Sequence, residues 1–170
     1  EVDKSEDRLE TTAIAMVKSA LNHVKLLELR DFHNIKISLK ASDVPTTVRA
    51  YQLLAQECDY PFNIGITEAG TPFCGTIKSS VGLGILLSQG LGDTLRVSLT
   101  GDPVEEVRVG FEILKSLGLR EFGPTIISCP TCGRCQIDII NIATEVEKRI
   151  QSLRSTPTVA IMGCVVNGPG

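Results

Sequence analysis

The amino-acid sequence predicts an α/β fold: the second half of a TIM (β/α)8 barrel, followed by the beginning of a second α/β domain. Strand-like segments alternate with helical segments, which is the order expected for parallel strands joined by crossover helices. The first four strand segments begin at residues 34, 62, 94 and 124. They recur about every 30 residues, close to the spacing of about 31 residues in a complete eight-unit barrel. A doubly wound open sheet has the same period and remains the alternative.

The predicted helices have apolar residues at helical spacing, and two of them have a recognisable start. Asp43 is the expected N-cap of one helix, with Pro45 in its first turn, and Asp102 is the expected N-cap of another, before Pro103. The predicted helices cover residues 8–32, 44–59, 74–90, 104–119 and 135–153. The predicted strands cover residues 34–40, 62–67, 94–100, 124–129 and 158–164.

The domain boundary is expected just before the first of several clustered cysteines. Residues 1–127 are assigned to the C-terminal half of the barrel, and residues 128–170 to the N-terminal part of the second domain. The sequence has no initiator Met and ends on Pro169-Gly170. We therefore expect it to be a fragment of a longer protein.

Composition and charge exclude several classes of function. The chain has 170 residues and a net charge of -3, so it lacks the basic surface typical of proteins that bind nucleic acid or acidic membranes. Aromatic residues make up 4% and tryptophan is absent, which disfavours base stacking. Its apolar stretches are too short for a transmembrane helix. Neither a G-x-G-x-x-G nor a P-loop motif is present.

Polar side chains gather at the ends of successive predicted strands, where barrel enzymes build their active sites. Lys40 ends the first strand, Glu68 follows the second, and Arg96 and Ser98 share one face of the third. Each has an ordinary explanation: Lys40 and Glu68 as solvated loop ends, and Arg96 as the internal partner of Glu68 or an aspartate. Together, however, they indicate a site for a small anion, best a phosphate or diphosphate, with Glu68 as a general acid or base.

Four of the six cysteines fall in the last quarter of the chain. Cys129, Cys132 and Cys135 follow a C-x2-C-x2-C spacing, and Cys164 is distant in sequence. Clustered thiols suit an iron–sulfur cluster, with structural zinc second and a redox dithiol at Cys129 and Cys132 third. Such clustering favours a site in a reducing compartment.

Six segments of the sequence resemble a known family. They are "ISLKASDV", "GITEAG", "KSSVGLGILLSQGLGDTLRVSL", "DPVEEVRVGFEILKSLGLR", "CPTCGR" and "MGCVVNGPG". Together they resemble the 4-hydroxy-3-methylbut-2-enyl diphosphate synthases over essentially the whole chain after the first helix. The resemblance implies a TIM barrel joined to a C-terminal [4Fe–4S] domain. It implies a reductase that opens 2-C-methyl-D-erythritol 2,4-cyclodiphosphate in isoprenoid biosynthesis, with loss of a hydroxyl as water.

The resemblance also implies roles for individual residues and partners. By motif, the cluster thiolates are Cys129, Cys132 and Cys164. The cyclodiphosphate is held by Lys40, Arg96 and Ser98, Glu68 transfers a proton, and Asn167 meets the substrate from the cluster side. Electrons come from a flavodoxin or ferredoxin, and the full-length protein is expected to be a homodimer that binds neither nucleic acid nor membrane.

The sequence departs from the family pattern at two points. The family motif continues past "NGPG" with a glutamate that ligates iron and would be residue 171. The family most often has no cysteine at position 135, so the resemblance makes Cys135 a bystander near a helix start, although spacing alone assigns it to the cluster. We expect the 170-residue chain alone to be inactive. The competing hypothesis is a non-catalytic module that binds structural zinc or an iron–sulfur cluster.

Overall fold

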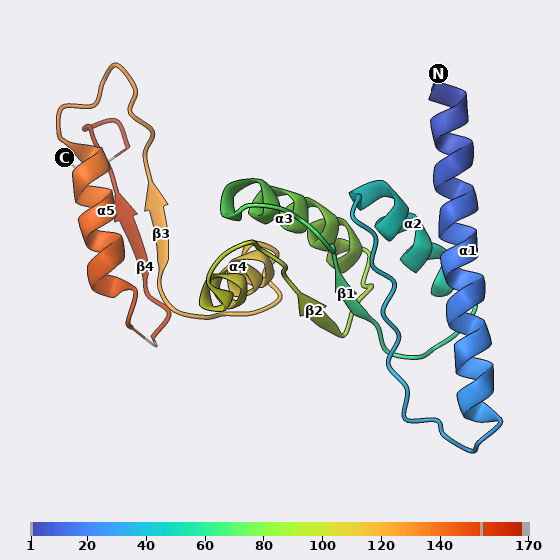
Figure 1. Ribbon diagram of the computed structural model, residues 1–170. Helices are drawn as coiled ribbons and strands as arrows, with labels where there is room; N and C mark the ends of the chain where they lie inside the picture. Colours follow the sequence, from blue (N-terminus) through green and yellow to red (C-terminus); the bar gives the residue numbers. More distant parts are fainter. Residues whose placement is uncertain (1, 154, 168–170) are drawn as a thin grey trace. The chain divides into compact units, whose positions relative to one another are not determined.

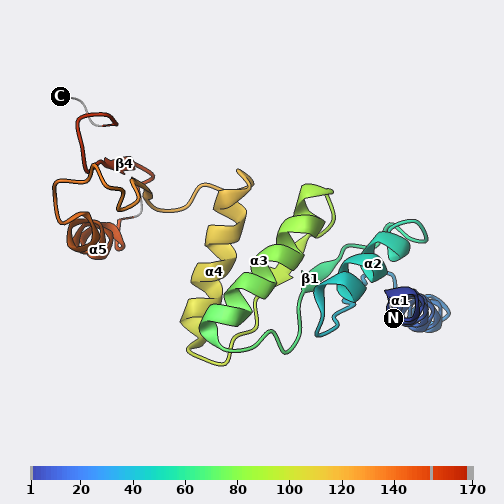
Figure 2. The ribbon, with the colours of Figure 1, turned by 90° about the horizontal axis from the view of Figure 1, so that it is seen from above.

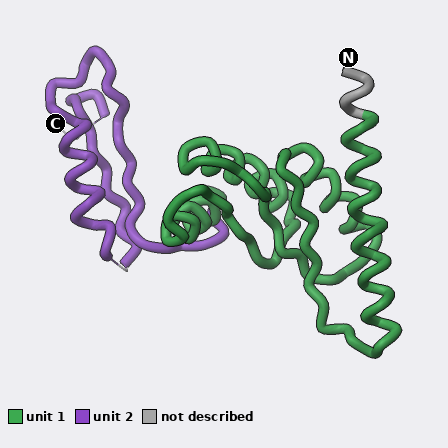
Figure 3. The backbone as a smooth tube through the Cα atoms, viewed as in Figure 1, with its two compact units in different colours: residues 1–117 green, residues 118–170 purple. Residues whose placement is uncertain are grey.

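The chain folds into two compact units. The computed structural model describes residues 2–153 and 155–167, with side chains described from Asp7 onward. The first unit comprises Glu1–Leu117 and the second Gly118–Gly170 (Figure 3). The predicted boundary at 127/128 stays a prediction, and the contacts within the chain divide it ten residues earlier in sequence.

The first unit alternates helices with parallel strands, as predicted (Figure 1). Its elements are α1 (Val2–Glu28), α2 (Val44–Leu54), β1 (Asn63–Gly65), α3 (Pro72–Ser88), β2 (Thr94–Arg96) and α4 (Pro103–Ser116). Neighbouring helices pack in chain order, α1 on α2, α2 on α3 and α3 on α4 (Figure 2). This is the arrangement of helices around one side of a parallel sheet.

The sheet of the first unit is shorter than the sequence predicts. β1 and β2 pair in parallel, from Asn63 opposite Thr94 to Gly65 opposite Arg96. The predicted strand 34–40 forms only a single bridge, between Ile37 and Phe62. Its neighbouring residues nevertheless keep strand-like alternation of buried and outward side chains.

Beyond the Ile37 bridge, the side-chain hydroxyl of Tyr51 connects segment 34–40 to β1 in place of a direct backbone hydrogen bond. The buried Tyr51 Oη accepts a hydrogen bond from the backbone N–H of Leu39 at 2.9 Å and donates one to the Asn63 carbonyl at 2.6 Å. The Tyr51 ring packs on Phe62 with ring centroids 5.6 Å apart. Burial raises the pKa of Tyr51, opposed in part by its hydrogen bonds, so the hydroxyl stays a donor. The core of the unit thus ties segment 34–40 to β1.

The two faces of this sheet differ: apolar side chains on one face pack into the core, and the other face carries polar side chains. Ile35, Ile37 and Leu39 are buried against the helices, together with Ile64 of β1 and Val97 after β2. The intervening side chains of the same segments point to the opposite face, which carries Lys36, Ser38, Lys40, Thr94 and Arg96. The helices cover only the apolar face.

The predicted helix starts at the two aspartates are confirmed. Asp43 accepts a hydrogen bond from Thr46 N at 2.8 Å, and Asp102 accepts one from Val104 N at 2.9 Å. Each cap satisfies a backbone donor that the first helical turn leaves free. Both helices therefore begin just after a strand segment, which fixes the loops at the strand ends.

The second unit is a parallel strand pair with one helix. Its elements are β3 (Thr125–Ser128), α5 (Ile139–Ile150) and β4 (Thr158–Ile161). β3 pairs with β4 in register, from Thr125 opposite Thr158 to Ser128 opposite Ile161. In the described chain the ladder partner of segment 124–129 is β4, so these residues do not extend the sheet formed by β1 and β2.

No helix of the described residues is long and apolar enough to cross a membrane.

We predict that Tyr51→Phe destabilises the first unit by about 1–3 kcal/mol, because it leaves the buried Leu39 N–H without an acceptor. Urea unfolding followed by circular dichroism measures the change. Tyr60→Phe is the matched control, since its hydroxyl donates to the Glu28 carboxylate at the surface. Its effect should be much smaller, and equal effects of the two substitutions would contradict the role given to Tyr51.

Candidate functional site

Lys40 lies across the outward face of the sheet. Its ammonium donates a hydrogen bond to Ser38 Oγ at 2.6 Å. Its side chain passes over Gly65 so closely that a Cβ at that position would lie 2.9 Å from Lys40 Cε and 2.5 Å from the Arg96 carbonyl oxygen. A side chain at residue 65 would therefore displace Lys40 or β2. The glycine brings the first and third strand segments together on this face.

The surroundings of Lys40 are electropositive. Partial burial lowers the pKa of Lys40, and the nearby charges of Arg96 and Lys36 lower it further. Within the described part of the chain, neither Lys40 nor Arg96 forms an ion pair with a carboxylate. The ordinary explanation for Arg96, an internal partner such as Glu68 or an aspartate, is thus wrong. An anion bound here would relieve the repulsion between the cations.

Two more of the predicted site residues lie at the carboxyl ends of the strands. Ser98 is half-buried and follows β2 on the same face as Arg96. Glu68 is exposed and has φ 51°, a left-handed conformation that is uncommon for a residue other than glycine. Gly70, with φ 120°, completes the turn into α3. Strained backbone of this kind clusters at functional sites, so Glu68 stays a candidate for proton transfer.

The second unit brings the ends of two cysteine-bearing segments together. Cys129 directly follows β3, and its N–H donates to the Ile161 carbonyl at the end of β4 at 3.0 Å. Cys164 lies three residues after Ile161, in the turn that leaves β4. The parallel register therefore explains how cysteines far apart in sequence come to one end of the strand pair. All six cysteines are free thiols.

The side chains of Asn167 and Met162 contact the thiol of Cys129. Asn167 Nδ2 lies 3.3 Å from Cys129 Sγ and can donate to it, and the Met162 sulfur also lies 3.3 Å from Cys129 Sγ. Among the residues that the structure describes, no three His, Cys, Asp or Glu side chains stand close enough to hold a metal ion. The structure therefore places Cys129 and Asn167 together without bringing three sulfurs to one point.

The loop between Cys129 and α5 favours one thiolate. Hydrogen bonding from the Arg134 backbone N–H lowers the pKa of Cys132, and the Arg134 charge lowers it further. Cys132 is exposed, and the loop turns tightly there, with Cys135 N donating to the Cys132 carbonyl at 2.9 Å. A thiolate is the form that binds metals.

The Cys135 side chain packs against Gly163, although its sequence spacing suggested a place beside Cys129 and Cys132. Its thiol donates to the Ile137 carbonyl at 3.3 Å, and a Cβ on Gly163 would lie 2.6 Å from its sulfur. Cys135 therefore packs on the buried Gly163, four residues before α5 begins and not in a helix. The predicted helix start at 135 is wrong because Asp138 caps α5 at Asn141 N, 3.3 Å away.

A redox dithiol at Cys129 and Cys132 is favoured when a helix begins directly after the first cysteine, because the helix N-terminus stabilises its thiolate. In the structure residues 129–138 are a loop, so no helix N-terminus stabilises a thiolate there. Cys74, the first residue of the helix predicted over 74–90, lies in the exposed first turn of α3.

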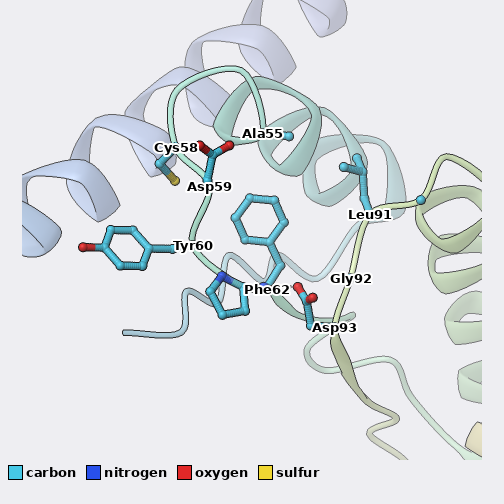
Figure 4. Close-up of a pocket in the computed structure, with 10 residues that line it drawn as sticks. Ala55, Cys58, Asp59, Tyr60, Phe62, Leu91, Gly92 and Asp93 are labelled. Atoms are coloured by element: carbon cyan, nitrogen blue, oxygen red, sulfur yellow. Dashed lines mark hydrogen bonds between the residues drawn. The ribbon is translucent and has the colours of Figure 1, made fainter. Parts of the chain in front are cut away.

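A shallow pocket lies at the opposite end of the strands from Lys40 (Figure 4). Its lining includes Cys58, Tyr60 and Phe62 before β1, and Leu91 and Asp93 before β2. The Asp93 carboxylate accepts a hydrogen bond from Phe62 N at 2.7 Å, which gives it a structural role. Barrel sites form at the carboxyl ends of strands, so this pocket is not the candidate site.

Sequence reasoning missed Ser38 and Gly65. Both lie on the outward face with Lys40, and the period of two along segment 34–40 puts Ser38 beside Lys40. That period was available in the sequence. The approach of Gly65 was not, because it depends on the register with β2.

Comparisons with known proteins agree with this arrangement. The GcpE TIM-barrel domain model matches residues 2–111, and the GcpE protein C-terminal domain model matches residues 125–170. The chain belongs to the GcpE family. Its α/β fold is therefore part of a TIM barrel, as predicted, and the doubly wound alternative is excluded.

Several curated relatives are similar along almost the whole chain. Proteins named 4-hydroxy-3-methylbut-2-en-1-yl diphosphate synthase (flavodoxin) from Geobacter sulfurreducens, Maridesulfovibrio salexigens and Clostridium perfringens are 70%, 63% and 60% identical to it over 159 residues. These matches cover 94% of the chain but 45%, 44% and 46% of the relatives. The chain therefore spans less than half of their length. The resemblance found in the motifs is confirmed.

We predict that Arg96→Gln raises the pKa of Lys40, because it removes a neighbouring positive charge. Carbon-13 NMR of the lysine side chains during a pH titration measures this pKa, with Lys40→Arg used for assignment. Arg108→Gln is the control, since Arg108 pairs with Glu105 on α4. An unchanged pKa in Arg96→Gln, or an equal rise in Arg108→Gln, contradicts the cation cluster.

The same substitution changes how stability depends on pH. Because the folded state lowers the pKa of Lys40, the unfolded chain holds that proton to higher pH. Lys40 therefore makes the free energy of unfolding increase as the pH rises from the lowered pKa of the folded state to the ordinary lysine pKa of the unfolded chain. Arg96→Gln should reduce this rise in urea titrations.

Proposed function

We propose that the protein containing this sequence is the iron–sulfur reductase that converts 2-C-methyl-D-erythritol 2,4-cyclodiphosphate to 4-hydroxy-3-methylbut-2-enyl diphosphate. The observation that carries the proposal is the outward face of the first unit, where Lys40 and Arg96 lie close together without a carboxylate partner among the described residues. Such a face suits a diphosphate. The printed names of the relatives identify the reaction product.

Lys40, Arg96 and Ser98 bind the substrate in this proposal. The two cations supply charge-assisted hydrogen bonds to phosphate oxygens, and the Ser98 hydroxyl supplies a neutral donor. Arg96 is the last residue of β2, Ser98 lies two residues beyond it, and Lys40 ends segment 34–40, so all three lie close to the strands and hold the diphosphate in one orientation. All three residues lie within the segment that the TIM-barrel domain model matches, residues 2–111. In such barrels the active site forms at the carboxyl ends of the strands.

Glu68 and Asn167 are the catalytic residues. The reaction adds electrons, breaks the ring carbon–oxygen bond to phosphate, and releases a hydroxyl that must take up a proton to leave as water. Glu68, exposed in its left-handed turn, is the carboxyl group that delivers that proton. Asn167 lies beside the Cys129 thiol and presents an amide to the substrate hydroxyls.

A [4Fe–4S] cluster is the proposed cofactor, held by Cys129, Cys132 and Cys164. The donor chemistry fits, because all three are free, soft thiol ligands, and the Cys132 pKa is lowered toward the thiolate. The register of β3 and β4 also supports bringing the first and last thiols to one end of the unit. When bound, the cluster supplies single electrons to the substrate.

The remaining partners follow from this function. A flavodoxin or ferredoxin delivers the electrons, and the relatives carry flavodoxin in their names. We propose a homodimer in the cytoplasm or a plastid. Six free thiols support a reducing compartment.

We predict that anaerobic reconstitution of the complete gene product with iron and sulfide gives a brown protein with absorption near ~400 nm. Cys129→Ala, Cys132→Ala and Cys164→Ala should each lose most of the iron and the colour. Cys135→Ala and Cys74→Ala are matched controls that should keep both. Iron and sulfide analysis with visible absorption measures the outcome.

Two results would contradict this cluster assignment. A colourless protein that binds one zinc ion through the same cysteines indicates the structural module instead. Equal loss of iron in Cys135→Ala returns that residue to the ligand set.

We predict that Glu68→Gln lowers kcat for the cyclodiphosphate about 100-fold or more, with little change in KM, because the amide cannot supply the proton. Turnover of the reconstituted complete gene product with a reduced flavodoxin measures it. Glu57→Gln, an exposed carboxylate after α2, is the control and should leave turnover unchanged. A Glu68→Gln enzyme with wild-type kcat excludes the role in proton transfer.

A further inference from the structure

Ser38 makes two hydrogen bonds that connect Lys40 to the backbone of the neighbouring strand. Its hydroxyl donates to the Asn63 carbonyl at 3.1 Å and accepts from the Lys40 ammonium at 2.6 Å. A serine hydroxyl can do both at once, since it has one donor and two acceptor positions. The Lys40 head group is thereby attached to β1 instead of extending freely into solvent.

The same carbonyl also anchors the core. Asn63 O accepts from the buried Tyr51 hydroxyl, which in turn accepts from Leu39 N. A continuous series of hydrogen bonds therefore runs from the core of the unit to the Lys40 ammonium. The bonds form two arms that meet at the Asn63 carbonyl, and within each arm the hydroxyl that accepts a hydrogen bond becomes a stronger donor to that carbonyl.

Gly65 defines the path of the lysine between these two anchors. Because a Cβ at residue 65 would approach Lys40 Cε to 2.9 Å, the aliphatic chain lies directly on the β1 backbone. In register with Gly65 is Arg96, whose charge contributes to the lowered pKa of Lys40. The head group is thus held near a like charge, an arrangement that only a bound anion makes favourable.

We propose that Ser38 is a positioning residue for diphosphate binding: it holds the Lys40 ammonium across Gly65 so that Lys40 and Arg96 engage one anion together. The inference rests on the proposed function and adds a residue to its substrate site. Ser38 acts through Lys40. The single proton of its hydroxyl is directed to the Asn63 carbonyl, so no donor remains for a phosphate oxygen, and its oxygen accepts from the Lys40 ammonium. A preorganised cation binds with less loss of side-chain freedom.

The test is a double-mutant cycle with inorganic pyrophosphate as the probe. Affinity is measured by calorimetric titration of the complete gene product at fixed ionic strength. Ser38→Val should weaken binding about five- to tenfold, less than the loss of a direct hydrogen bond to a charged group, because Ser38 acts on the anion only through Lys40. Threonine has nearly the same shape as valine but keeps the hydroxyl. The affinity of Ser38→Thr for pyrophosphate should therefore stay within about twofold of that of the parent protein. In the Lys40→Ala background, Ser38→Val should add less than about twofold.

Controls separate the two levels of the proposal. Thr94→Val changes an exposed residue on the same face and should leave affinity unchanged. Thermal unfolding reports whether each variant folds, and Ser38→Ala replaces Ser38→Val if the latter does not. Equal effects of Ser38→Val in both backgrounds, or equal losses in Ser38→Val and Ser38→Thr, overturn the positioning role. If Lys40→Ala itself leaves affinity unchanged, the proposed anion site fails and the positioning role fails with it.

Discussion

A parallel sheet must have both faces covered, and the helices of the first unit cover only one. Ile37, Ile64 and Val97 pack under α2, α3 and α4, and this apolar contact holds the unit together. The opposite face carries Lys40 and Arg96. In a TIM barrel the face away from the helices lines the barrel interior, where the strand ends form the active site. The polar side chains of this face lie toward the strand ends, where the fold of the family places its active site.

Charge on that face has a direct consequence for ligand binding. Cations that lie together without a carboxylate partner destabilise each other: burial lowers the pKa of Lys40, and the charges of Arg96 and Lys36 lower it further. A protein tolerates such an arrangement when the site serves a function that needs it. The two hydrogen bonds of Ser38 and the missing side chain of Gly65 keep Lys40 in this position although it would be better solvated elsewhere. The repulsion between these cations therefore favours the binding of an anion.

Local chemistry made much of the fold predictable from sequence. Asp43 and Asp102 identified their helix starts because an N-cap requires only contacts within four residues. The repeat of about 30 residues indicated alternating strands and helices for the same kind of reason, since each unit contains one strand and one helix, but it did not separate a barrel from a doubly wound sheet. The partner of β3 was not predictable, because a parallel strand has the same pattern whichever neighbour it pairs with. The Tyr51 hydroxyl bridge also depends on packing that no local pattern contains.

The cysteine loop illustrates the same limit at the candidate site. Equal spacing gave Cys129, Cys132 and Cys135 equal standing, the family resemblance set Cys135 apart, and the fold shows a physical difference between them. Asp138 starts α5 late, which leaves the first two thiols in a loop and turns the third onto Gly163. A loop without a helix N-terminus stabilises a thiolate only through local donors such as the Arg134 N–H. Thiols in that setting suit a soft metal centre better than a disulfide exchange reaction, which depends on a thiolate stabilised by the helix itself.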